Sequence, residues 1–232
     1  MYRVGFIAVA LLSLTLMFAA AAAVNAETVT PGITVTGSAD AAGKPDVAYV
    51  TLGVTTEDKV AATAARDNAS QTAAVIEAIV KSGVTKDNIQ TSQYSVSPIV
   101  NYESNPPVTT GYRVSNQVRA TVRDLDRVGG LIDAAMTAGA NVVRGVTFDI
   151  ENPNALRQQA LVAAMKSANA DAVLIAQTLG VKLGRPTSAS MVGPVGPRPY
   201  DMPMMKMDAV STPIVPGNVT VSASITVVYS IL

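Results

Sequence analysis

The sequence predicts an α+β protein in which mostly antiparallel sheets carry helices on one face. Several stretches alternate apolar and polar residues with a period of two, which is typical of strands with one solvent-exposed face. Helical periodicity ends at Gly83, Gly139 and Gly180, and a strand pattern follows directly each time. This recurrence indicates related β–α–β type units. The long hairpins between strand patterns argue against a doubly wound parallel sheet.

The chain begins with the pattern of a cleaved N-terminal signal peptide. A short positive segment, Met1–Arg3, precedes an apolar run that reaches Val24, and small or permitted residues lead up to Ala26. We therefore expect cleavage after Ala26 and export to the periplasm. A retained membrane anchor is the alternative, because the run has nearly spanning length, but the cleavage pattern favours removal. Residues 1–26 are left out of the expected fold, and residues 27–232 are treated as one domain.

The composition excludes many kinds of enzymatic function. The chain contains no histidine and no cysteine, and 17 basic residues balance 17 acidic ones. Without imidazole or thiol, most general bases, nucleophiles and metal sites are excluded, so we expect no enzyme and no cofactor. A balanced charge also argues against a nucleic-acid partner. An exported chain without disulfides must be held together by its core, its sheets or self-association.

The first half of the expected domain contains strands around one long helix. Strands are expected at residues 33–37, 47–56, 89–100 and 112–123, with a turn at 43–46 and a hairpin loop at 101–107. The helix runs from Lys59 to Ser82. Its spacing predicts an inner face made of Ala65, Ala69, Ala73, Ile76 and Val80. In the second arm of the hairpin, apolar even positions alternate with polar odd ones, so one face is expected to be buried.

The second half contains the longest expected helix, which ends at Leu179. Asn152 suits the N-cap, Pro153 the first helical position and Gly180 a left-handed stop. Spacings of three and four residues predict one packed face made of Leu161, Met165, Ala168, Ala172, Ile175 and Leu179. A shorter helix is expected at 125–138, strands at 142–150, 181–192 and 219–231, and a Pro/Met-rich loop at 193–217.

Three arginines share one face of an expected strand and form a candidate binding site. Arg113, Arg119 and Arg123 occupy odd positions of the hairpin's second arm, and Arg127 follows just beyond. One interpretation is a docking stripe for an anionic ligand, a lipid headgroup or an acidic protein surface. The other is a solvated face whose arginines pair with acidic residues on a neighbouring strand. The absence of interleaved aromatic residues favours the second interpretation.

Four methionines lie close together in the Pro/Met-rich loop: Met202, Met204, Met205 and Met207. Clustered thioethers are soft ligands for Cu(I), and they can also be oxidised reversibly to sulfoxides. With no histidine or cysteine to support a metal site, the other interpretation is a loop that packs on a partner subunit or an apolar surface. Copper binding or oxidant scavenging therefore stands as the alternative to a structural role.

Three carboxylate pairs could serve as acid/base dyads only if they converged on a cleft. They are Glu57 with Asp58, Asp124 with Asp126, and Asp149 with Glu151. Each pair lies at an expected strand or helix end, where capping and the helix dipole explain acidic residues. The chain also lacks the spacings of serine nucleophiles and phosphate loops. We expect these carboxylates to be structural.

Eight short stretches, in their order and spacing, resemble the SIMPL-domain family, which includes bacterial periplasmic immunogenic and oxidative-stress defence proteins. The stretches are Ile33–Gly37, Lys86–Thr91, Tyr94–Pro98, Gly111–Asn116, Val122–Asp126, Ala138–Asn141, Leu179–Gly184 and Val221–Tyr229. The resemblance covers nearly all of the expected mature chain. It implies an exported α+β protein without an established catalytic activity, and it supplies no catalytic residues to carry over.

The resemblance also implies a partner and a role. Some members of the family assemble into large ring-like or channel-like homo-oligomers, and some are linked to protection against oxidative stress. We therefore expect a non-enzymatic periplasmic protein that forms a homo-oligomer, associates with the outer membrane or envelope, and serves envelope integrity or oxidative-stress defence.

Overall fold

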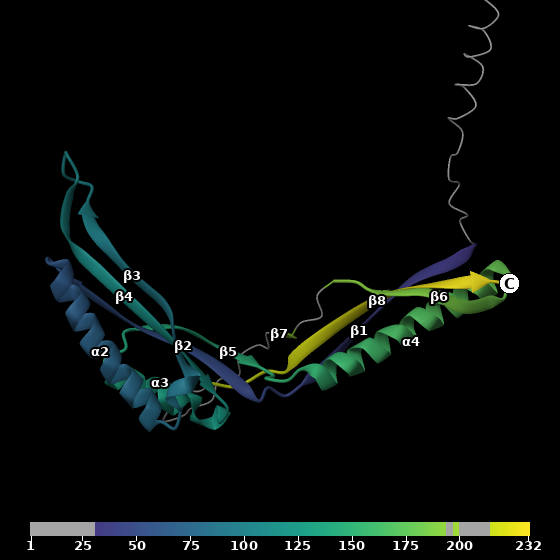
Figure 1. Cartoon of the computed structure of the whole chain (residues 1–232), viewed down its shortest axis with the longest axis horizontal. Coiled ribbons are helices and arrows are strands. Elements are labelled where there is room, and N and C mark those ends of the chain that lie inside the picture. The colour runs from purple at the N-terminus through teal and green to yellow at the C-terminus, as the bar shows by residue number, and fades with distance from the viewer. Residues whose placement is uncertain (1–30, 194–196, 200–213) are drawn as a thin grey trace, which may run out of the picture.

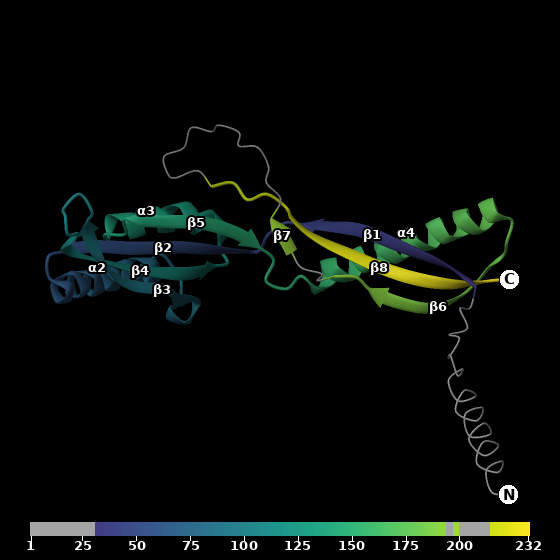
Figure 2. The same cartoon turned by 90° about the horizontal axis from the view of Figure 1, so that it is seen from above.

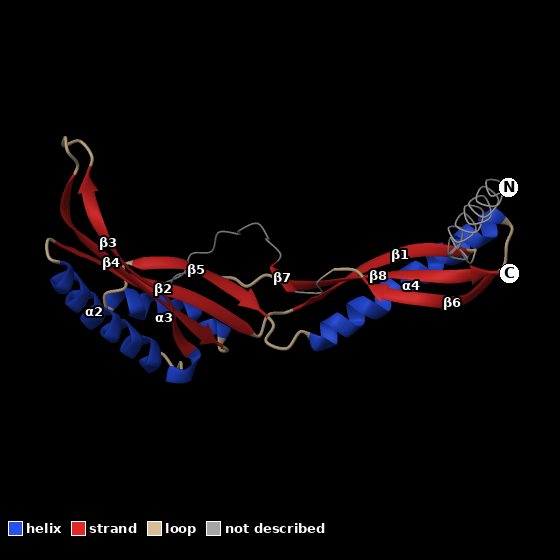
Figure 3. Ribbon diagram, turned by 45° about the horizontal axis from the view of Figure 1, so that its top comes forward, coloured by secondary structure: helices blue, strands red, loops and turns tan. Residues whose placement is uncertain are grey.

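The computed structural model describes residues 31–193, 197–199 and 214–232. Within them the chain forms two sheets, each with helices on one face, and the two layers lie end to end in an elongated molecule (Figure 1). Every strand pairing in the described residues is antiparallel. The α+β class, the antiparallel sheets and the one-sided helices predicted from sequence are confirmed (Figure 3).

The first sheet joins the two ends of the described chain. Its order is β1 (Gly32–Gly43), β8 (Val219–Ile231) and β6 (Leu183–Met191), with β7 (Pro197–Pro199) also paired to β8. β1 and β8 pair along their whole length, from Gly32 opposite Ser230 to Gly43 opposite Val219. The long helix α4 (Asn154–Leu179) packs on β1 and β8 (Figure 2). The alternation predicted for β8 is confirmed, because Val219 to Tyr229 are buried at every second position.

The second sheet has the order β3 (Ile89–Asn101), β4 (Val108–Val122), β2 (Val47–Asp58) and β5 (Val142–Asp149). The helices α2 (Ala61–Lys81) and α3 (Val128–Thr137) cover one face of this sheet. Two short 3₁₀ turns, η1 (Lys86–Asn88) and η2 (Leu125–Arg127), follow α2 and precede α3. The predicted turn at residues 43–46 carries the chain from the first sheet to the second.

The packed face predicted for α4 is wrong. The buried residues are alanines at every fourth position: Ala160, Ala164, Ala168, Ala172 and Ala176. Of the predicted face only Ala168 and Ala172 are buried, whereas Leu161 is half-buried and Met165, Ile175 and Leu179 are exposed. A strict four-residue spacing follows a row of side chains that is inclined to the helix axis. In the view of Figure 2, α4 crosses β1 and β8 at an angle. Period counting by hydrophobicity missed this face because alanine is a weak apolar signal.

The face predicted for α2 is also wrong, by one residue along the helix. The buried positions are Ala64, Asn68, Thr72, Val75 and Ile79, instead of Ala65, Ala69, Ala73, Ile76 and Val80. Two of the buried side chains are polar and carry their own partners. Nδ2 of Asn68 donates to the carbonyl oxygens of Val54 and Val114 at 2.9 and 3.2 Å, and Thr72 donates to Asn68 Oδ1 at 3.4 Å. An apolar pattern cannot locate a face that contains a satisfied polar pair.

The predicted helix ends are confirmed where glycine decides them. Gly83, Gly139 and Gly180 all have positive φ, at 100°, 114° and 70°, and each follows its helix closely. At the start of α4 the N-cap is Pro153 and not the predicted Asn152. Asn152 still supports the helix, because its Oδ1 accepts a hydrogen bond from the backbone N–H of Asn154 at 3.2 Å. In the described part of the chain, no helix is long and apolar enough to cross a membrane.

Candidate functional site

The arginine stripe on β4 lies opposite acidic and aromatic side chains of β2. Arg113 faces Glu57 in the strand register, and its Nε lies 2.6 Å from Glu57 Oε1. The guanidinium of Arg119 lies over the ring of Tyr49, with 4.2 Å between the guanidinium carbon and the ring centroid. Such stacking orders a guanidinium without neutralising it. Cross-strand pairing, one of the two interpretations left open by the sequence, is what the geometry shows at Arg113.

Arg123 is held by a carboxylate from outside its sheet. Its Nε and Nη2 donate to the two carboxylate oxygens of Glu151 at 2.8 and 2.5 Å, a bidentate geometry. This hydrogen bonding lowers the pKa of Glu151 and raises the pKa of Arg123. Glu151 precedes α4, and its backbone N–H donates to Asp46 Oδ1 at 2.8 Å, so the pair lies where the two layers meet. An anion that bound Arg123 would have to displace Glu151.

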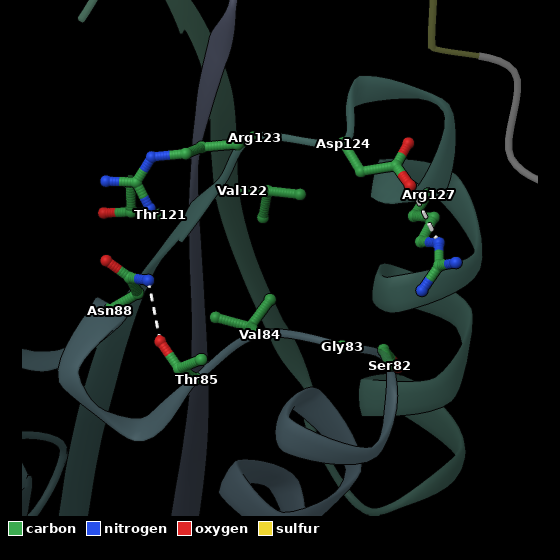
Figure 4. A pocket seen from close by; sticks show the side chains of 10 residues that line it. All are labelled: Ser82, Gly83, Val84, Thr85, Asn88, Thr121, Val122, Arg123, Asp124 and Arg127. Carbon is green, nitrogen blue, oxygen red and sulfur yellow. Dashed lines mark hydrogen bonds and ion pairs between the residues drawn. The ribbon is translucent and has the colours of Figure 1, made fainter.

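A cavity of about 370 Å³ lies beside Arg123, between the end of α2 and the end of β4. Val84 and Val122 point toward each other in its centre, and Arg123 and Arg127 lie at opposite sides (Figure 4). Arg127 Nε pairs with Asp124 Oδ2 at 2.9 Å. The cavity therefore combines an apolar centre with arginines that are already paired with carboxylates.

The predicted carboxylate pairs do not act together in the described structure. Glu57 binds Arg113, whereas Asp58 Oδ1 accepts from the N–H of Val60 at 2.7 Å, just before α2. The members of the other two pairs likewise have separate partners where these are described: Asp124 binds Arg127, Asp149 accepts from Ile150 N–H and Glu151 binds Arg123. Ion pairs and hydrogen bonds to nearby backbone N–H groups account for these acids, whereas the predicted side-chain capping of helix ends is not observed at α2, η2 or α4.

The four methionines of the Pro/Met-rich loop, Met202, Met204, Met205 and Met207, lie outside the described residues, as does the predicted signal segment. Copper binding or oxidant scavenging by that loop therefore stays a prediction. In residues 31–193, 197–199 and 214–232, no three acidic side chains gather closely enough to hold a metal ion.

Sequence reasoning missed two exposed apolar surfaces. One follows the edge strand β3 and its hairpin, where Tyr94, Val96, Tyr102 and Val108 are exposed. The other lies at the end of α4 and beside the C-terminus, where Leu174, Leu179 and Leu232 are exposed. Pattern analysis assigned Leu179 to the core, and it gave no reason to separate Tyr94 from other strand residues. Large exposed apolar groups on neighbouring elements mark interaction surfaces.

Comparison with known proteins identifies the family to which this architecture belongs. The SIMPL family model, described as a protein of unknown function (DUF541), matches residues 33–229. The chain belongs to the SIMPL family. The match runs from β1 to β8, so both layers of the molecule lie within the SIMPL region. The resemblance inferred from the short sequence stretches is confirmed.

Curated SIMPL relatives cover most of the chain. The chain is 30% identical over 210 residues to the 26 kDa periplasmic immunogenic protein of Brucella melitensis, covering 86% of this chain and 84% of that protein. It is 31% identical over 180 residues to the protein named "Uncharacterized protein YggE" of Escherichia coli strain K12, covering 77% of this chain and 73% of that protein. Neither name states a reaction or a ligand.

Proposed function

We propose that this SIMPL protein is a non-enzymatic periplasmic protein that assembles into a homo-oligomer and serves envelope integrity or oxidative-stress defence. The signal-peptide pattern that ends at Ala26 supports a periplasmic location, as does the periplasmic relative from Brucella melitensis. Non-enzymatic function is supported by the lack of histidine and cysteine and by the separate partners of the acidic residues.

The edge strand β3 carries the proposal of self-assembly. In the described residues β3 pairs only with β4, so its other edge presents unpaired backbone groups, with a missing N–H donor at Pro98. Tyr94 and Val96 lie on this strand with 56% and 46% of their surface exposed. The helix α2 packs mainly on β2 and β4, so β3 extends beyond its cover. An uncovered edge with apolar side chains is suited to pairing with another strand.

A second copy of the chain is the occupant that this edge fits. A two-fold axis perpendicular to the sheet would place two β3 strands antiparallel, with the helices of both copies on the same face. The hairpin tip adds Tyr102 and Val108, both exposed, beside the same edge. Such an isologous contact uses one surface twice and needs no further partner.

Assembly is tested by native mass spectrometry and light scattering on the exported protein. We expect a defined multimer of the wild type and a smaller species for Val96→Lys, because a lysine on an edge strand opposes pairing. Val162→Lys is the matched control, since Val162 on α4 is 47% exposed and Val96 is 46% exposed. A wild type that stays monomeric at micromolar concentration overturns self-assembly. Dissociation by Val162→Lys alone moves the interface from β3 to α4.

A Met-based copper-binding or oxidant-scavenging function is the second candidate, and the methionine spacing in the sequence is its support. Native mass spectra with and without Cu(I) measure metal stoichiometry, and the variant with Met202, Met204, Met205 and Met207 changed to leucine is the control. Equal Cu(I) binding by both proteins removes the copper function. Peroxide treatment that leaves these four methionines unoxidised removes the scavenging function.

A further inference from the structure

One end of the first layer combines exposed leucines with basic residues. We define this end, the α4 tip, by Leu179, Lys182, Arg185 and Leu232. Leu179 and Leu232 have 66% and 82% of their surface exposed. Leu232 lies against the segment that follows α4, because the backbones of Leu232 and Lys182 exchange two hydrogen bonds of 2.9 and 3.2 Å. The end of α4 and the C-terminus lie together at one end of the molecule (Figures 1 and 2).

The charge around the α4 tip is one-sided. Residues 172–193 and 219–232 contain no aspartate or glutamate, and Lys182 and Arg185 are the two charged side chains in those ranges. Both are exposed, and neither has an ion-pair partner among the described residues. Asp171 is the acidic residue that directly precedes the first range. Arg113 in β4 and Arg123 just after it differ, because they are already paired with Glu57 and Glu151.

The described part of the chain begins at the same tip. β1 begins at Gly32, which lies opposite Ser230, two residues before the C-terminal Leu232. The beginning of β1, the end of α4 and Leu232 therefore lie close together at this end of the first layer.

We propose that the α4 tip is a membrane-docking surface that inserts Leu179 and Leu232 at the surface of a bilayer containing anionic phospholipids. Exposed leucines at a helix end fit the boundary between headgroups and acyl chains. Lys182 and Arg185 lie beside them, where anionic headgroups would neutralise their free charges. The inference rests on the proposed envelope location and gives the protein its orientation there, with the second layer and β3 directed away from the lipid.

Vesicle co-sedimentation of the purified exported protein tests both parts of this surface. Vesicles of phosphatidylcholine mixed with phosphatidylglycerol are compared with vesicles of phosphatidylcholine alone, at low and high salt. We expect binding to the anionic vesicles that falls with salt. Leu179→Ser/Leu232→Ser is expected to lower the partition coefficient about tenfold or more, because two exposed leucines lose their apolar burial. Lys182→Glu/Arg185→Glu is expected to remove the preference for anionic lipid.

The matched control changes exposed apolar residues at the other end of the molecule. Met136→Ser/Val143→Ser removes side chains that are 53% and 44% exposed on α3 and β5 of the second layer, and it is expected to leave vesicle binding unchanged. Equal loss of binding by both double variants overturns docking through the α4 tip. Absence of binding to either kind of vesicle by the wild type also overturns it.

Fluorescence separates lipid contact from contact with another copy. The chain contains no tryptophan, so Leu179→Trp and Tyr102→Trp each introduce a single reporter. We expect the emission of Leu179→Trp, and not of Tyr102→Trp, to shift to the blue when anionic vesicles are added. A blue emission of Leu179→Trp without vesicles that does not change on their addition would mean that another copy covers the tip, and it overturns the proposal.

These outcomes are distinct from those of the proposed function. A multimeric wild type that ignores vesicles removes the docking surface and leaves self-assembly intact. A monomeric wild type that binds anionic vesicles through the α4 tip removes self-assembly and leaves the docking surface intact. Cell fractionation tests the periplasmic location independently of both.

Discussion

The two layers attach their helices to their sheets by different means. On β1 and β8, α4 buries only alanines, and its backbone comes so close to Gly37 that any side chain there would overlap the Ala164 carbonyl oxygen. On β2 and β4, α2 buries Val75 and Ile79 together with Asn68, whose amide bonds two strand carbonyls. The first contact depends on the absence of side chains and the second on a satisfied polar group.

The difference predicts which kind of substitution destabilises each layer. Close backbone packing tolerates no added volume, because neither the helix nor the strand can retreat without losing its own hydrogen bonds. A buried amide tolerates no loss of its donor, because the carbonyls that it serves are also removed from water. Volume changes should therefore damage the α4 layer most, and polar deletions the α2 layer.

The largest effect is expected from Gly37→Val in β1. An added Cβ would lie far inside van der Waals contact with the carbonyl oxygen of Ala164 and the backbone nitrogen of Ala168, and backbone cannot move aside as a flexible side chain can. We expect a loss of about 3 kcal/mol or more in the free energy of unfolding. Urea denaturation gives the magnitude, and hydrogen exchange shows whether β1, β8 and α4 open while β2 and β4 stay protected.

Gly130→Ala in α3 is the matched control for that change. No atom lies within 4 Å of a Cβ added at Gly130, and the residue is helical and exposed. We expect a gain of about 0.5–1 kcal/mol, because alanine restricts the unfolded chain more than glycine does. If Gly37→Val were as harmless as Gly130→Ala, close packing of α4 would not distinguish the two layers.

The types of the main elements and the glycine-terminated helix ends could be predicted from sequence because local signals decide them, whereas the first strand, expected at 33–37, runs from Gly32 to Gly43. Glycine at a left-handed position fixed the ends at Gly83, Gly139 and Gly180, and period-two alternation fixed β8. The buried faces of α2 and α4 could not be predicted by the same counting. Their selection depends on tertiary contacts, namely the strand carbonyls that bind Asn68 and the bare backbone at Gly37.

The candidate sites, too, could be predicted from the sequence only in part. The arginines of β4 were found from sequence, and so was the option that acidic neighbours pair with them, because strand spacing predicts a shared face. The identity of Glu151 as the partner of Arg123 depends on how the chain crosses from β5 to α4, which no local pattern contains. The α4 tip was missed because Leu179 had been assigned to a core face and Leu232 lies far from it in sequence.

The second effect in size is expected from Asn68→Ala in α2. The change removes the hydrogen bonds to the carbonyls of Val54 and Val114 and leaves a small cavity, so we expect a loss of roughly 2 kcal/mol. Asn169→Ala in α4 is the control, because the exposed Asn169 makes one hydrogen bond of 3.3 Å to the hydroxyl of Tyr229. Its expected loss is within about 0.5 kcal/mol. Equal losses in thermal or urea denaturation would contradict a special role for the buried amide.

A smaller effect is expected at the end of α4, where the layer relies on glycine again. Gly180 has φ of 70°, and its N–H bonds the carbonyl of Gln177 at 3.2 Å. Gly180→Ala should cost about 1 kcal/mol, because a Cβ disfavours the left-handed region. Gly180→Asn should cost less, since asparagine tolerates that region better. Thermal denaturation of the two variants measures the order, and an asparagine variant less stable than the alanine variant would contradict left-handed strain as the cause.

The smallest effect concerns the ion pair that lies where the layers meet. Hydrogen bonding to Arg123 lowers the pKa of Glu151, so the pair stabilises the fold above the ordinary carboxyl range, and this contribution is lost as the pH falls through the lowered pKa. Both side chains are about half exposed, so salt screens the contribution.

Carbon-13 NMR titration should show the pKa of Glu151 rising toward its ordinary value in Arg123→Gln. The pKa of Glu77, which Lys81 lowers by hydrogen bonding, should stay where it is. If Arg123→Gln left the pKa of Glu151 unchanged, Arg123 would not hold the segment before α4 to β4, and the two layers would have to be coupled at their junction by backbone contacts such as that of Glu151 N–H with Asp46.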